Sequence, residues 1–447
     1  MKPAKASTGL FVLLLLPSIL TSQIHAQNDY SIQFSMLKAP FLRLDYIPVS
    51  ARSAAMGGAF IGAAQDESAA PINPAGLAIM QKAGISLNQH WSQTQYYPPG
   101  YEIDPMLAAG FKAIRFDQTM VGVFVPLKNF TIAMHRQVVL DADFFFETQP
   151  IISPSSTGSD SEYDGRQVNL DYKLISDAIS VGFRLHRRLS IGISGKLTGL
   201  KLNLGERIFT PDQSNNNAEN LDATVGVAHR LNEPNFSAGI MADVSRSKLF
   251  AGAVYHYNPS YALKADMFFP TRIDDESGRA PELVDFKLCL NIPDIYGAGL
   301  YYVPSDRWSF TFDVVRILYS QLATEIRNTN SAQLNMSDVA PESAVYKPKN
   351  ATEIRFGIEY LPPVPDLGFI PLQTIFLRTG LYSDPGQKWR SDGDRNLLYP
   401  EVDSNLRFSF GLGLQITNHL KIDVAGVATG DRVEAVGSAL VSVDIGM

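Results

Sequence analysis

Most of this chain alternates apolar and polar residues with a period of two. In the run from Leu406 to Ile416, every second residue is apolar, and the residues between them are arginine, serine, glycine or glutamine. The alternation resumes at Leu420, after a short polar turn at Asn418 and His419. Because neighbouring side chains of a β-strand point to opposite faces, this pattern predicts antiparallel strands joined by hairpins from about residue 83 onwards.

Two kinds of fold use such strands. A soluble sheet packs its apolar face on a core, whereas a membrane barrel turns that face towards lipid and lines a lumen with its polar face. Several runs reach the roughly 9–11 residues that cross a bilayer obliquely, and short turns alternate with long polar loops, which favours the barrel. A soluble all-β sandwich is the alternative. The long loops are expected near residues 148–166, 205–220, 324–350 and 383–404.

The composition excludes several other classes of protein. A chain with 45% hydrophobic and 19% charged residues is too apolar for disorder, and a net charge of −7 argues against nucleic-acid binding. The single cysteine, Cys289, excludes a disulfide framework, and the seven histidines show no metal-ligand spacing. The Gly-x-Ser-x-Gly, phosphate-loop and HExxH motifs are absent from the sequence. We expect no metal, no cofactor and no enzymatic activity.

The N-terminus has the pattern of a bacterial secretory signal peptide. Lys2 and Lys5 precede the apolar run FVLLLLPSIL at residues 11–20, and a polar stretch follows it. A membrane anchor is the alternative, but the run is shorter than the roughly 20 residues of a spanning helix. We expect residues 1–26 to be removed by cleavage after Ala26, which makes the mature chain an exported protein.

A segment between the signal peptide and the strands breaks the alternation. Residues 52–79 are rich in alanine and glycine. Asn73 suits a helix N-cap and Pro74 suits the first helical position, which predicts a short helix over residues 75–80. A large barrel needs a filled lumen if the membrane is not to leak. We therefore expect residues 27–82 to form a compact plug, or hatch, for a barrel of residues 83–447.

Several blocks of this sequence match the motifs of a known family. They are Ala51–Phe60, Asp66–Ala69, Asn73–Leu77, Ile292–Tyr302, Asp306–Trp308, Asp313, Arg355–Tyr360 and Leu377–Pro385. In these blocks the chain resembles the FadL-type outer-membrane transporters of long-chain fatty acids and other hydrophobic compounds. The likeness is specific in the first three blocks, which correspond to the family's hatch, and in residues 292–313. It is loose in the long loops.

The resemblance implies a monomeric barrel of about fourteen strands in the bacterial outer membrane, with a helical hatch in its lumen. A hydrophobic small molecule would enter an apolar pocket from outside. Hatch movement would then let it leave sideways into the outer-membrane lipid. The family's hatch motif falls on Asn73, Pro74, Ala75 and Gly76, which we expect to gate the pocket. A simple helix cap is the alternative role for Asn73.

Two groups of side chains are candidates for ligand binding. Phe144, Phe145 and Phe146 lie where a strand meets a long loop, which suits an apolar landing site, with an aromatic girdle or loop packing as the alternative. A basic residue on the polar side of a strand can pair with a ligand carboxylate, or with a lumen carboxylate such as Glu353 or Glu359. The basic candidates are Arg184, Arg355 and Arg378, with Lys196 and Arg407 in similar positions.

Two functions from different classes fit this sequence. The first is passive uptake of hydrophobic small molecules, either long-chain fatty acids or hydrocarbons. The second is a PorV-like shuttle barrel of a protein secretion system, because residues 41–60 also resemble the start of those proteins. The plug disfavours a general hydrophilic porin.

Overall fold

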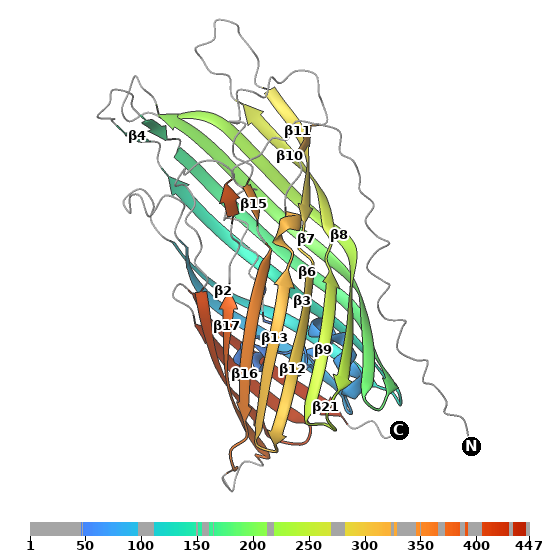
Figure 1. Cartoon of the computed structure of the whole chain (residues 1–447). Coiled ribbons are helices and arrows are strands. Elements are labelled where there is room, and N and C mark those ends of the chain that lie inside the picture. The colour runs from blue at the N-terminus through green and yellow to red at the C-terminus, as the bar shows by residue number, and fades with distance from the viewer. Residues whose placement is uncertain are drawn as a thin grey trace, which may run out of the picture.

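The chain folds into a closed antiparallel β-barrel around a small helical hatch (Figure 1). The predicted barrel of about fourteen strands is therefore confirmed. None of the described helices is long and apolar enough to cross a membrane. The computed structural model describes residues 46, 48–96, 111–148, 151–153, 161–163, 165–211, 219–269, 282–322, 326–328, 346–348, 350–364, 372–384, 389–391, 405–428 and 432–443.

The barrel strands pair with their neighbours in chain order, and the last strand pairs with the first to close the ring. The hairpin turn at residues 418–419 lies where the sequence predicted it. The strands are β1 (Ala83–Tyr96), β2 (Phe111–Pro126), β3 (Phe130–Thr148), β6 (Gly165–His186), β7 (Leu189–Pro211), β8 (Glu219–Asp243), β9 (Leu249–Tyr257), β12 (Ile295–Ser305), β13 (Trp308–Ile317), β16 (Ala351–Tyr360), β17 (Thr374–Asp384), β19 (Asn405–Gln415), β20 (Leu420–Ala428) and β21 (Arg432–Val443).

On one side the wall continues beyond the main ring. β10 (Ser260–Phe269) follows β9 after a two-residue break, and it pairs with β8 and with β11 (Glu282–Asn291). The short helix η2 (Tyr319–Leu322) separates β13 from β14 (Ile326–Asn328), which pairs with β11. Two small ladders are separate from this sheet. They join β4 (Ile151–Ser153) to β5 (Ser161–Tyr163) and β15 (Tyr346–Pro348) to β18 (Trp389–Ser391).

The barrel wall carries apolar side chains outside and polar side chains inside. In β13, Trp308 and Phe312 are each 43% exposed, whereas Thr311 and Asp313 are buried. β19 repeats this arrangement along the alternating run of residues 406–415. An apolar outer face suits a hydrocarbon environment, and a polar inner face suits a lumen that a hatch fills.

The hatch consists of α2 (Ala51–Ala55), α3 (Ala69–Ile72) and the 3-10 helix η1 (Pro74–Ile79), which Figure 1 shows in blue inside the barrel. α2 packs against β17, β19, β20 and β21, while η1 packs against β3, β6, β7 and β8. Asn73 caps η1 by accepting a hydrogen bond from the backbone N–H of Ala75 over 3.2 Å. The short helix predicted from this N-cap is confirmed, shifted by one residue.

Paired glycines on neighbouring strands make room for the hatch. Gly192 on β7 pairs with Gly182 on β6 and with Gly239 on β8. A Cβ atom at Gly192 would lie 2.2 Å from the carbonyl carbon of Pro74. Any side chain at this point would push η1 away from the wall, so the glycines fix how closely the hatch approaches the strands.

Some strands are longer than the sequence indicated. The loop expected near residues 205–220 is partly wrong, because β7 continues to Pro211 and β8 begins at Glu219. Residues 219–243 form the single strand β8. Pro234 does not interrupt it, because the described ladders leave one edge of β8 unpaired at that position and no N–H is needed there.

Candidate transport site

A cavity of about 270 Å³ lies between the hatch and the barrel wall. Its hatch side includes Ala54, Ile61 and Ile72, and its wall side includes apolar residues from many strands. Burial of apolar surface in such a space is worth roughly 25 cal/mol per Å². The apolar wall residues are Val139, Leu174, Val254, Ile292, Ile295, Val315, Ile317 and Val427.

One arc of the cavity wall is polar and carries a cation. Lys196 on β7 lies in register with Asn235 on β8, and both line the cavity. No carboxylate among the described residues forms an ion pair with Lys196. His256 on β9 lines the same arc, where its Nδ1 lies 2.6 Å from the hydroxyl of Ser237. An enclosed cation without a counter-ion favours an anionic group beside it.

The facing arc also carries charge, but there the charge is compensated. Arg355 on β16 donates from Nε to a carboxylate oxygen of Glu353 over 3.0 Å. Its Nη1 donates to the backbone carbonyl of Gly58 in the hatch over 3.1 Å. The guanidinium of Arg407 lies 5.6 Å from the ring centroid of Tyr382. This arc therefore gives an incoming anion less attraction than Lys196 does.

The barrel wall has a long unpaired seam between β2 and β3. The two strands pair only from Met120 with Gln137 down to Pro126 with Thr131. Beyond that point, residues 111–119 of β2 and 138–148 of β3 form no ladder with each other, although β2 stays paired with β1 and β3 with β6. Gln137 and Val139 line the cavity, so the cavity reaches the base of this seam. Val139 is also the bulged residue in the β3–β6 ladder.

Asn73 links the two halves of the hatch to the wall. In addition to capping η1, its Nδ2 donates to the carbonyl of Ile61 over 3.0 Å and to the carbonyl of Ile240 on β8 over 3.3 Å. Arg184 on β6 holds the other end of η1 by donating to the carbonyl of Ala78 over 2.8 Å. Movement of η1 would break these hydrogen bonds together.

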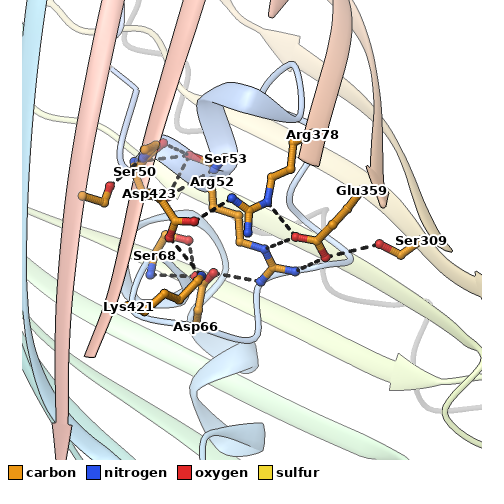
Figure 2. Close-up of polar contacts among 12 residues, drawn as sticks. Ser50, Arg52, Ser53, Asp66, Ser68, Ser309, Glu359, Arg378, Lys421 and Asp423 are labelled. Atoms are coloured by element: carbon orange, nitrogen blue, oxygen red, sulfur yellow. Dashed lines mark hydrogen bonds and ion pairs between the residues drawn. The ribbon is translucent and has the colours of Figure 1, made fainter. Parts of the chain in front are cut away.

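A buried ion network joins the hatch to the opposite side of the barrel, as Figure 2 shows. Arg52 of α2 contacts Asp66 of the hatch at 2.9 Å and Glu359 of β16 at 3.2 Å. Glu359 also accepts a 2.6 Å contact from Arg378 of β17, which reaches Asp423 of β20 at 2.6 Å. Because the side chains of the three barrel residues are at most 4% exposed, removal of one partner would leave a buried charge unpaired.

Glu67 is a further hatch acid beside Asp66. Its side chain is buried, and its Oε2 atom has no hydrogen-bond partner among the described residues. Burial, followed by the negative charge of Asp66, raises the pKa of Glu67 to about 7. The hatch therefore contains an acid whose charge changes near neutral pH.

The residues singled out from the sequence fall into different environments. Arg355 lines the cavity, whereas Arg184 anchors η1 and Arg378 belongs to the ion network. The hatch motif lies at the start of η1, next to the glycine pairs of β6 to β8. The backbone of Phe144, Phe145 and Phe146 pairs with β6, in the part of β3 that forms no ladder with β2, and their side chains lie outside the described residues.

Several polar lining residues were not singled out from the sequence, among them Gln137, Ser176, Thr198 and Asn235. Because side chains alternate between the two faces of a strand, these residues face the lumen, but many other polar residues do so too. The signal that separates them is cross-strand register, which depends on the pairing of β3, β6, β7 and β8. Among the described residues, no group of three or more His, Cys, Asp or Glu side chains is placed to hold a metal ion.

A closed barrel with an apolar outer face, a lumenal hatch and an internal cavity defines a plugged outer-membrane transport barrel. Comparison with protein families agrees, since residues 44–430 match the model of outer membrane protein transport proteins (OMPP1/FadL/TodX). The chain belongs to this family of transporters of hydrophobic compounds, and it is a protein of the Gram-negative outer membrane. The family's transport role points away from catalysis.

Solved structures share this fold. A Pseudomonas aeruginosa FadL homologue superimposes with a TM-score of 0.61 at 15% identity, over 89% of this chain and 99% of that one. The Pseudomonas putida toluene transporter TodX gives 0.54 at 13% identity, over 90% and 98%. The monoaromatic hydrocarbon channel CymD gives 0.55 at 13% identity, over 90% and 99%. At these identities the likeness shows the fold alone. No curated protein sequence gives a significant match.

Proposed function

We propose that this chain takes up hydrophobic small molecules through the internal cavity and releases them through the β2–β3 seam into outer-membrane lipid. The observation that carries the proposal is the contact between the cavity and the base of the seam at Gln137 and Val139. Unpaired strand edges are costly in lipid unless they line a cavity or a passage. A seam that opens from an apolar cavity fits such a passage.

The driving force for this route is the hydrophobic effect. Each methylene group removed from water is worth about 0.8 kcal/mol, so an apolar cavity competes well with the aqueous phase outside. Because lipid offers the same gain without confinement, the ligand then leaves sideways and needs no energy source. Movement of the hatch at Asn73, Pro74, Ala75 and Gly76 gates the cavity in this scheme, since η1 borders the wall strands that surround it.

The finer proposal concerns the kind of ligand. Lys196 favours a hydrophobic molecule with one acidic group, such as a long-chain carboxylate, over a neutral hydrocarbon. Support comes from the position of its ammonium group in a cavity whose other described acids and bases are largely paired. The carboxylate would lie at Lys196, and the chain would occupy the apolar part of the cavity.

A disulfide across the seam tests the route. Thr119 and Val138 are the next residues beyond the last β2–β3 pair. In a Cys289→Ser background, we would introduce Thr119→Cys with Val138→Cys and measure uptake of labelled oleate by cells. We expect uptake to stop under oxidation, to return on reduction, and oleate binding by the purified protein to persist. Unchanged uptake by the oxidised protein would refute lateral release.

A second cysteine pair controls for the cross-link itself. Leu412 and Val424 already face each other in the β19–β20 ladder on the outer face of the barrel. Leu412→Cys with Val424→Cys should form a disulfide without loss of uptake.

Mass spectrometry of the purified protein separates the two functions considered from the sequence. A bound acid or hydrocarbon supports uptake, whereas an empty cavity and a copurified exported protein would support the shuttle.

A further inference from the structure

A row of uncharged polar side chains crosses the inner wall from Lys196 to the seam. Gln137 on β3 lies in register with Ser176 on β6, and Ser176 lies in register with Thr198 on β7. Thr198 is two residues from Lys196 on the same face of β7, and Lys196 is in register with Asn235. All five side chains line the cavity. The row therefore follows one path from the cation to the last paired residue of β3.

The hydrogen bonds within this row leave donors for a ligand. The hydroxyl of Thr198 donates to Oδ1 of Asn235 over 2.8 Å, and it lies 3.1 Å from the hydroxyl of Ser176. Since the Thr198 proton is already used, Ser176 must donate in the second contact. Within the described part of the chain, the amide nitrogens of Asn235 and Gln137 have no partner. Both ends of the row thus offer N–H groups, which suit an acceptor-rich, anionic group.

Beside this row, the remaining cavity residues near the seam are Val139 and Leu174, whose side chains offer no hydrogen bond. A carboxylate that left Lys196 across apolar side chains would lose its hydrogen bonds before it reached lipid headgroups or water. A molecule without a polar head has no such barrier.

We propose that Asn235, Thr198, Ser176 and Gln137 form a polar track that passes the acidic head of the ligand from Lys196 to the β2–β3 seam. Asn235 and Gln137 supply amide donors, and the hydroxyls of Thr198 and Ser176 turn their protons from each other and from Asn235 to the passing carboxylate. The track is a positioning and specificity device: it accelerates the release of acids and leaves the release of neutral molecules unchanged. This inference rests on the proposed uptake function, and it adds the residues that guide one chemical class along the exit path.

The test separates binding from release. The purified protein, reconstituted in phospholipid vesicles, would be loaded with cis-parinaric acid or with its methyl ester, and release into lipid would be followed by fluorescence. For Thr198→Val and for Gln137→Leu, we expect the release of the acid to slow by about tenfold or more, with its equilibrium affinity changed by less than about threefold. Release of the methyl ester should match that of the wild type.

Thr131→Val is the matched control. Thr131 is also a buried, inward-facing threonine, but it lies on β3 outside the cavity. The control should release both probes at the wild-type rate, and heat-modifiable migration on gels should show that all variants fold. Equal slowing of acid and ester, or lost acid affinity with unchanged release, would overturn the track. A wild-type protein that binds neither probe would overturn the uptake function itself, and the track with it.

Discussion

The two sides of this barrel differ in how the wall and the hatch are joined. On one side, β16, β17 and β20 are linked to α2 by buried ion pairs through Arg52 and Arg378. On the other side, the ladder between β2 and β3 ends at Gln137, and the cavity reaches that residue. Because a buried ion pair tolerates little displacement, the first side keeps the hatch in place. The second side leaves the wall free to open, so one barrel combines a fixed anchor with an exit.

Removal of an arginine from the anchored side should have the largest effect on stability. Arg378→Met would leave Glu359 and Asp423 buried with less positive charge beside them. We expect a loss of about 3–5 kcal/mol in the free energy of unfolding, measured by urea titration of tryptophan fluorescence in detergent. Lys201→Met is the control, because the Lys201–Asp171 pair is exposed and should contribute less than about 1 kcal/mol. Similar losses in both variants would contradict an anchor built on burial.

On the side of the barrel that contains the β2–β3 seam, the largest expected effect is on ligand affinity. Lys196→Met should weaken the binding of oleate by roughly 10–100-fold, because a hydrogen bond to a charged group contributes about 1.5–3 kcal/mol. Methyl oleate should bind as before, since it carries no charge. Isothermal titration with both ligands measures the difference. Lys128→Met, in the exposed turn between β2 and β3, should change neither affinity. An equal loss for both ligands would show that Lys196 only shapes the cavity.

Asn73 lies between the two sides, and its variants should have moderate effects. Asn73→Ala removes the cap of η1 and the contacts with Ile61 and Ile240, and loss of the cap alone costs about 1 kcal/mol. Asn73→Asp keeps the cap but loses both donated hydrogen bonds. Hydrogen exchange of the amides of residues 75–79 should accelerate in the alanine variant more than in the aspartate variant. If the two variants exchange alike, the cap does not control the order of η1.

The smallest expected effect is the pH dependence of hatch packing. The pKa of Glu67 is about 7 in the fold, against 4.5 for a free glutamate, so the folded state binds the proton more tightly. The stability that this acid contributes is complete below pH 4.5, and it falls as pH rises to about 7. Glu67→Gln should remove this slope from urea titrations made between pH 5 and pH 8. A slope that persists in the variant would assign it to another group.

The strands were predictable because their signal is local. Each residue of an alternating run, such as residues 406–416, faces either lipid or lumen, and that choice is visible in the order of the amino acids. The signal is weaker where a strand continues into polar sequence. The sequence therefore predicts a loop at residues 205–220, although β7 continues to Pro211 and β8 begins at Glu219. Pro234 sits inside β8 for a reason that only the unpaired neighbouring edge explains.

The candidate site was less predictable because it depends on distant strands. The sequence marked Arg184, Arg355, Arg378 and Lys196 as inward-facing cations without separating their roles. Cross-strand register placed Arg378 among acids, Arg184 against η1, and Lys196 in the cavity without a carboxylate partner among the described residues. No local pattern distinguishes these positions, since each side chain is a cation in an alternating strand.

The sequence by itself determined the class of fold, the presence of a hatch and the cap of its last helix. These properties follow from periodicity, composition and short-range hydrogen bonds, which act between residues that are close in the chain. The tertiary structure decided which charges pair, where β2 and β3 separate, and which side chains meet at the cavity. Those properties follow from how strands far apart in the chain align, and a shift of one residue in that alignment would send each of these side chains to the opposite face.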